Sequence, residues 1–116
     1  MKHSSLLHLG CAFALCLGTA VPSVAAPKLT GVDKIHDQRR VGGKICFIDH
    51  AHRGEANMPS KRGAQAAAQR AWEVFTRDEY GTAWGRYSLA INKRMECKAS
   101  GSRWTCETTA IPCRPR

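Results

Sequence analysis

Six cysteines in a chain of 116 residues constrain its fold more than any other sequence feature. Two of them, Cys11 and Cys16, lie in an N-terminal segment that has the features of a secretory leader. The cysteines that an exported protein would keep are Cys46, Cys97, Cys106 and Cys113. In an oxidising compartment, an even number of cysteines in a small domain indicates a disulfide framework first of all. The spacing contains no C-x-x-C, which argues against a thioredoxin-like redox site.

The first 25 residues have the composition of a signal peptide. Lys2 gives a charged start, Leu6 to Val21 is mostly apolar without a carboxylate, and small residues precede a cleavage point after Ala25. A lipoprotein site at Cys11 and an uncleaved membrane anchor are alternatives, and the apolar stretch is short for both. Cleavage of residues 1–25 from 116 leaves 91 residues with no expected membrane span. The net charge then falls from +9 to +8, because Lys2 is lost.

The rest of the chain is long enough for one small domain, which excludes Rossmann, TIM-barrel and repeat architectures. Residues 26–43 are polar and punctuated by glycine, and we expect a loose arm there. Residues 44–49 (KICFID) are a short apolar run typical of a covered strand. Residues 50–60 are expected to form a loop ending in Ser60, a good helix N-cap. The disulfide-stabilised domain is expected to span residues 44–116.

An amphipathic helix is predicted over residues 60–80. Trp72 and Phe75 fall on one apolar stripe at helical spacing, and Gly81 is typical of a residue that ends a helix. Asp78 and Glu79 lie near the negative end of the helix dipole, an unfavourable position for carboxylates that the pattern does not explain.

A β-hairpin is predicted from about residue 86 to 111, although residues 82–91 also fit a second helix. Polar and apolar residues alternate before the turn signal Gly101-Ser102. A two-residue loop there places Cys97 directly opposite Cys106 in a non-hydrogen-bonded pair, which is close enough for a disulfide. We therefore expect that bridge.

The remaining cysteines, Cys46 and Cys113, would then join the first strand to the C-terminus. Closing so long a loop should stabilise the domain by about 4 kcal/mol in the chain-entropy picture. The hairpin register also sets Glu96 opposite Glu107, a mildly unfavourable pair of like charges. The expected fold class is α+β: one amphipathic helix packed on a small antiparallel sheet with a C-terminal β-hairpin, stabilised by disulfides.

An ordered set of aromatic, glycine and cysteine residues covers the last third to half of the chain. Its members are Ala71-Trp72, Tyr80-Gly81, Trp84, Ala90, Cys97, Trp104-x-Cys106, Ala110 and Pro112-Cys113. This order resembles a pattern that recurs in small exported proteins of Gram-negative bacteria with no established activity. The resemblance implies a periplasmic or secreted protein with a cysteine framework, and it assigns no catalytic residue.

A histidine-rich segment is the best candidate for chemistry. His50 and His52 point to the same side of an extended chain, and Asp49 or Glu55 could complete a three-ligand zinc, copper or nickel site. His36, in the predicted arm, is a further candidate ligand. The plainer interpretation is that the two histidines of a polar loop are solvated surface groups.

The same histidines also fit the acid-base pair of a small secreted phosphodiesterase or nuclease, with Glu55 and nearby cations beside them. The hypothesis depends on geometry that the sequence does not contain, since any basic protein with two histidines offers this inventory. No G-x-S-x-G occurs, so a serine hydrolase is not indicated.

Basic residues spread along the whole chain are the broadest signal. They include Lys34, Arg39, Arg40, Lys44, Arg53, Lys61, Arg62, Arg70, Lys93, Arg94, Lys98, Arg103, Arg114 and Arg116. Their charge favours an anionic partner such as an envelope component or an acidic protein. Nucleic acid is disfavoured, because Trp72, Trp84 and Trp104 are expected to pack in a core rather than to stack on bases. The first hypothesis is therefore a non-enzymatic exported binding or envelope-associated module without a cofactor, and metal binding and phosphodiester hydrolysis are the alternatives.

Overall fold

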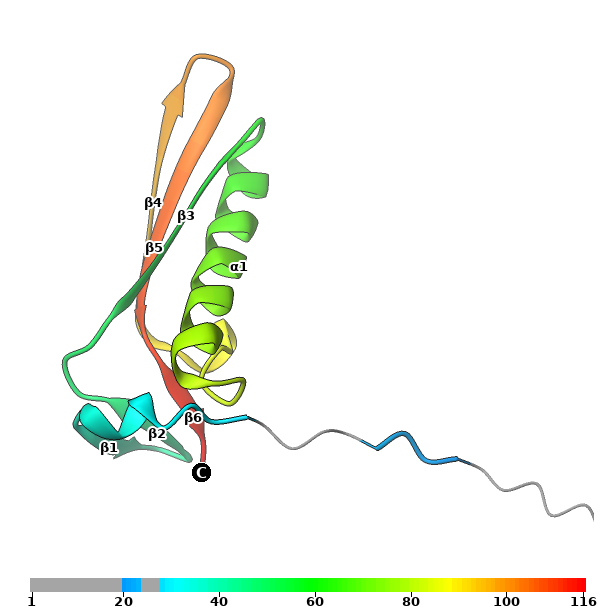
Figure 1. Cartoon of the computed structure of the whole chain (residues 1–116). Helices are drawn as coiled ribbons and strands as arrows, with labels where there is room; N and C mark the ends of the chain where they lie inside the picture. Colours follow the sequence, from blue (N-terminus) through cyan, green and yellow to red (C-terminus); the bar gives the residue numbers. More distant parts are fainter. Residues whose placement is uncertain (1–19, 24–27) are drawn as a thin grey trace, which may run out of the picture.

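The computed structural model describes residues 20–23 and 28–116 (Figure 1). The elements in chain order are η1 (Val32–Ile35), β1 (Gln38–Val41), β2 (Lys44–Phe47), β3 (His52–Met58), α1 (Lys61–Tyr80), η2 (Tyr87–Leu89), β4 (Ile91–Ser100), β5 (Arg103–Ile111) and β6 (Cys113–Pro115). The predicted leader, residues 1–25, lies outside the described residues except for residues 20–23, and its cleavage stays a prediction.

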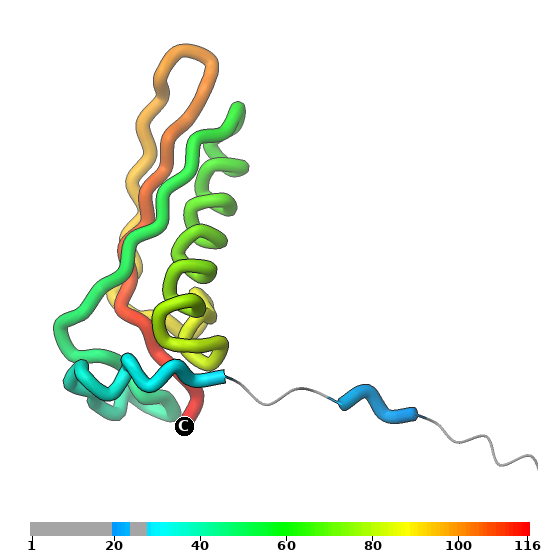
Figure 2. The backbone as a smooth tube through the Cα atoms, in the orientation of Figure 1, coloured from blue at the N-terminus to red at the C-terminus, as the bar shows by residue number. Residues whose placement is uncertain are grey.

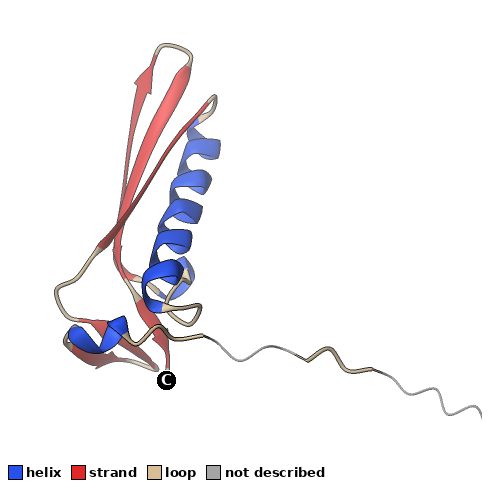
Figure 3. Ribbon diagram, in the orientation of Figure 1, coloured by secondary structure: helices blue, strands red, loops and turns tan. Residues whose placement is uncertain are grey.

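The strands form two antiparallel three-stranded sheets. The larger has the order β3-β5-β4, and the smaller has the order β1-β2-β6. Helix α1 lies along one face of the larger sheet, and the smaller sheet lies beyond the C-terminal end of the helix (Figures 1 and 3). The expected α+β class, with one helix on small antiparallel sheets, is confirmed.

The β4–β5 hairpin has the predicted register. Cys97 lies opposite Cys106 and Glu96 lies opposite Glu107. The chain between α1 and β4 forms only the short turn η2, so it is neither the start of the hairpin nor a second helix. The hairpin strand begins at Ile91 rather than near residue 86.

Two disulfides hold the fold, with the predicted partners. The hairpin disulfide joins Cys97 to Cys106, and the terminal disulfide joins Cys46 in β2 to Cys113 in β6. A fold stabilised in this way belongs to an oxidising, extracytoplasmic compartment. None of the helices in the described ranges is long and apolar enough to cross a membrane.

Helix α1 buries a stripe that differs from the predicted one. Ser60 caps it as expected, its Oγ accepting a hydrogen bond from the Gly63 amide at 3.0 Å. The buried side chains repeat every four residues: Ala64, Ala68, Trp72, Thr76 and Tyr80. Phe75 is 51% exposed, so its predicted place in the buried stripe is wrong. The buried polar residue Thr76 takes that place in the stripe and faces β3.

Strand β3 replaces the loop predicted over residues 50–60. Its inward positions include His52, Gly54 and Ala56, which give no hydrophobic alternation for sequence analysis to detect. Gly54 lets the strand approach α1, because a Cβ there would lie 2.2 Å from the carbonyl oxygen of Ala68.

The segment predicted as a loose arm, residues 26–43, is structured where it is described. It contributes η1 and β1, and β1 pairs with β2. Upstream of these, Lys28 and Leu29 cross the C-terminal end of α1, where Leu29 bridges to Gly81 (Figure 2). A Cβ at Gly81 would lie 1.9 Å from the carbonyl oxygen of Lys28, so only glycine fits this crossing.

Candidate metal site

Three candidate metal ligands converge near the junction of the two sheets. His50 lies in the loop after β2, His52 is the first residue of β3, and Glu79 lies in the last turn of α1. One ligand atom from each residue lies within 4.8 Å of the others. Among the described residues, this is the one group of three or more His, Cys, Asp or Glu side chains that could hold a metal ion.

The buried hydroxyl of Thr76 fixes the tautomer of His52. Thr76 Oγ1 donates to the Trp72 carbonyl oxygen at 2.7 Å, and a carbonyl can only accept. A hydroxyl has one proton, so the 2.8 Å contact between Thr76 Oγ1 and His52 Nδ1 must be donated by the ring. The proton of a neutral His52 is therefore on Nδ1, and the lone pair of Nε2 points into the site.

That lone pair faces the Glu79 carboxylate and lies close to a second ring nitrogen. Glu79 Oε2 lies 3.2 Å from His52 Nε2, and His50 Nε2 lies 3.1 Å from it. His52 is 3% exposed, and its burial lowers its pKa to about 4, so the ring is neutral at pH 7. The pKa of His50 is also lowered, first by burial and then by the neighbouring His36. The His52 lone pair therefore lies beside a carboxylate that has no proton to donate to it.

The phenol of Tyr80 completes the cluster from the end of α1. Its oxygen lies 2.8 Å from His50 Nε2, 3.3 Å from His52 Nε2 and 3.0 Å from His36 Nε2. The ring of His36 stacks on that of His50, with 4.2 Å between their centroids. Burial is the main reason that the pKa of Tyr80 is raised, so the phenol keeps its proton in the metal-free protein.

The structure brings together the three histidines that the sequence singled out and neither of the two predicted carboxylates. Glu55 is exposed on the outer face of β3, because side chains three positions apart on a strand point to opposite faces. Asp49 is exposed beside the cluster. The carboxylate that does lie at the cluster is Glu79, one of the two acidic residues whose position near the end of α1 the sequence pattern left unexplained.

An open hollow of about 260 Å³ adjoins the cluster. It is lined by Ile35, His36, Asp37, Ile48, Asp49 and His50. Two of these residues belong to the histidine cluster, and two are carboxylates. The hollow therefore has negative charge beside two of the histidines, although the protein as a whole is basic.

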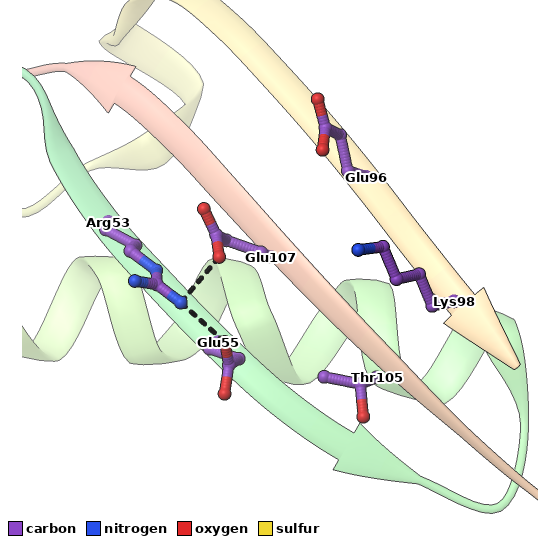
Figure 4. A pocket seen from close by; sticks show the side chains of 6 residues that line it. All are labelled: Arg53, Glu55, Glu96, Lys98, Thr105 and Glu107. Atoms are coloured by element: carbon purple, nitrogen blue, oxygen red, sulfur yellow. Dashed lines mark hydrogen bonds and ion pairs between the residues drawn. The ribbon is translucent and has the colours of Figure 1, made fainter. Parts of the chain in front are cut away.

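A second hollow, of about 310 Å³, lies on the open face of the larger sheet (Figure 4). It is centred on Glu107, which lies directly between Glu55 and Glu96 on the neighbouring strands. Arg53 Nη2 bonds Glu55 at 2.7 Å and Glu107 at 2.6 Å. Arg53 thus offsets the repulsion between cross-strand carboxylates. Glu55 therefore lies on the opposite face of β3 from His52 and is not beside the two histidines that the nuclease hypothesis treats as an acid-base pair.

Comparisons with protein-family models, with curated proteins and with solved structures gave no match. The case for a function therefore depends on the geometry of the site.

Proposed function

We propose that this protein is an exported zinc-binding protein whose metal ligands are His50, His52 and Glu79. The observation that carries the proposal is the contact between His52 Nε2 and the Glu79 carboxylate, 3.2 Å apart. Thr76 leaves Nε2 without a proton, so two acceptors face each other, and a cation between them turns this repulsion into two bonds. In metal sites, a ligating histidine typically donates its other N–H to a fixed acceptor, as His52 does to Thr76.

The distances support the same proposal. Zinc bonds to nitrogen and oxygen of about 2.0–2.2 Å place tetrahedral ligand atoms about 3.3 Å apart. The contacts of His52 Nε2 with His50 Nε2 and with Glu79 Oε2, at 3.1 and 3.2 Å, are close to this value. The Glu79 side chain is 34% exposed, so it has room to adjust around an ion. Two imidazoles and one carboxylate are a ligand set that zinc uses in proteins.

Export from the cytoplasm is the second part of this proposal. The two disulfides support an oxidising compartment, and the leader-like residues 1–25 support transfer to the periplasm or medium with cleavage near Ala25. The resemblance to small exported proteins of Gram-negative bacteria agrees with this location. The ion would be acquired outside the cytoplasm.

Competition between the protein and a chromophoric chelator for Zn²⁺ tests the proposal. We expect one Zn²⁺ per chain, and a loss of affinity of at least about a hundredfold in His52→Ala and in Glu79→Gln, since each removes a direct ligand. Glu55→Gln is the matched control, because it makes the same chemical change on the outer face of β3.

Native mass spectrometry of the same variants gives the stoichiometry, and circular dichroism checks that each variant is folded. Absence of zinc binding in the folded wild-type protein would overturn the proposal. Equal affinity in Glu79→Gln and Glu55→Gln would remove Glu79 from the site.

A second candidate function, binding of an anionic envelope component, is favoured by the smaller sheet. Strands β1, β2 and β6 carry four cations and no carboxylate side chain: Arg39, Arg40, Lys44 and Arg114. Such a concentration of one sign attracts phosphate-bearing surfaces in a salt-dependent manner. Co-sedimentation with vesicles that contain anionic lipid is the test. Binding that is insensitive to Arg39→Ala with Arg40→Ala would count against this surface.

A further inference from the structure

We propose that the phenol oxygen of Tyr80 is the fourth metal ligand, which makes the site a closed one that holds an ion rather than one that activates water. This inference rests on the proposed function, because it concerns the same ion. The fourth ligand matters because a zinc ion with three protein ligands can bind a water molecule for hydrolysis, whereas a zinc ion with four protein ligands is simply held.

The position of the Tyr80 oxygen carries the inference. It lies 2.8 Å from His50 Nε2 and 3.3 Å from His52 Nε2, and the two nitrogens are 3.1 Å apart. Each of these separations is close to the spacing of about 3.3 Å between ligands of a tetrahedral zinc ion. The phenol oxygen therefore lies at ligand spacing from both histidine nitrogens, where it can take the fourth position that a catalytic zinc site leaves to a water molecule.

The surroundings of Tyr80 hold this oxygen in place. The residue is 0% exposed and packs against Phe47, with 4.8 Å between ring centroids. The Phe47 ring in turn stacks on Trp84 at 4.2 Å. A side chain packed on such a core does not swing away to admit a water molecule, because the core is dense and its rotamers are fixed.

Coordination changes the protonation of Tyr80 in a defined way. The O–H bond is replaced by an O–metal bond, and the displaced proton leaves to solvent. Metal ligands bind in their deprotonated form, so zinc binding should release one more proton than the other ligands require.

A site closed by four protein ligands has no open position for a substrate. The ion itself would then be the cargo. The hollow lined by His36, His50, Asp37 and Asp49 gives the ion its entry, because the carboxylates attract a cation at the mouth and the histidines stand inside.

Difference absorption spectroscopy during zinc titration at pH 7 is the first test. The chain has two tyrosines, Tyr80 and Tyr87, so a tyrosinate band can be assigned. We expect one tyrosinate per bound zinc in wild type and in the matched control Tyr87→Phe, and none in Tyr80→Phe. Tyr80→Phe should also weaken zinc binding by more than about tenfold, since loss of a ligand exceeds the loss of an outer-shell partner.

Copper is the second probe. Cu²⁺-loaded wild type should show a visible phenolate-to-copper charge-transfer band that is absent in Tyr80→Phe. A protein that binds one zinc through His52 and Glu79 but shows neither band would overturn this inference and leave the proposed function standing. A protein that binds no zinc would overturn both.

Discussion

Thr76→Val is the substitution that most sharply tests the orientation of His52. Thr76 is 0% exposed, and its hydroxyl accepts the Nδ1 proton of His52 at 2.8 Å. Valine keeps nearly the same shape but removes the acceptor, so the buried N–H is left without a partner. The structure therefore predicts two separate losses, one in stability and one in metal affinity.

The two magnitudes follow from the contacts. An unpaired buried N–H costs about 1–3 kcal/mol of stability. Loss of an outer-shell partner typically lowers metal affinity by about 10- to 100-fold, which is about 1.4–2.7 kcal/mol of binding free energy. The affinity falls because the tautomer with the proton on Nε2, which does not bind zinc, is no longer disfavoured.

The assay is chelator competition for Zn²⁺ together with urea unfolding of the metal-free protein. Thr108→Val is the matched control, since Thr108 is also 0% exposed and donates to the Arg94 carbonyl oxygen at 2.8 Å, away from the histidines. Thr108→Val should lose stability and keep its zinc affinity. Unchanged zinc affinity in folded Thr76→Val would refute the assignment of the His52 tautomer.

Three further predictions concern the fold and its response to pH. Replacing Cys46 and Cys113 by alanine should lower the free energy of unfolding by about 4 kcal/mol, because this disulfide closes a loop of 67 residues. Removing the hairpin disulfide should lower it by only about 2.6 kcal/mol, because the two cysteines are 9 residues apart. Urea unfolding measures both, and equal losses would contradict the loop argument. Gly54→Ala should cost about 3 kcal/mol or more, because the added methyl group would overlap the backbone of α1, and a thermal midpoint close to that of wild type would contradict the close approach. The pKa of His52 is lowered to about 4 in the fold, so the unfolded chain binds more protons between about pH 6.5 and 4. The metal-free protein should therefore lose up to about 3 kcal/mol of stability as the pH falls through this window. Urea unfolding at several pH values, with a chelator present, measures this loss. A loss of the same size in His52→Ala would show that it does not come from His52.

The sequence was sufficient to predict the elements that local chemistry determines. Ser60 and Gly81 mark the ends of α1, because a cap and a glycine act within a few residues of their own position. The Gly101-Ser102 turn determines the hairpin register, and that register places Cys97 opposite Cys106. With Cys97 paired to Cys106, Cys46 and Cys113 are the two cysteines of the expected mature chain that remain to pair.

The missed elements depend on contacts between distant residues. Strand β3 contains His52 and Gly54 at inward positions, and each is explained only by α1 lying against it. Phe75 was expected in the core because apolar spacing alone does not show that a threonine is needed opposite a histidine. The elements η1 and β1 were missed because β1 has two exposed arginines in four residues and is ordered by its pairing with β2.

The candidate site was half predictable for the same reason. His50 and His52 are neighbours in sequence, so their shared side follows from strand geometry. Glu79 and Tyr80 come from the far end of a helix of 20 residues, and only the packing of α1 against β3 brings them to the histidines. An acidic residue at the negative end of a helix is unfavourable, but this alone does not show which side chains lie next to it in the fold.

Anomalous diffraction from crystals of the protein loaded with zinc would locate the bound ion. We expect one zinc peak, within about 2.0–2.2 Å of Nε2 of His50, Nε2 of His52 and a carboxylate oxygen of Glu79. A crystal soaked in zinc with no peak at this position, or with its zinc bound by other residues, would show that these three side chains are not the metal ligands.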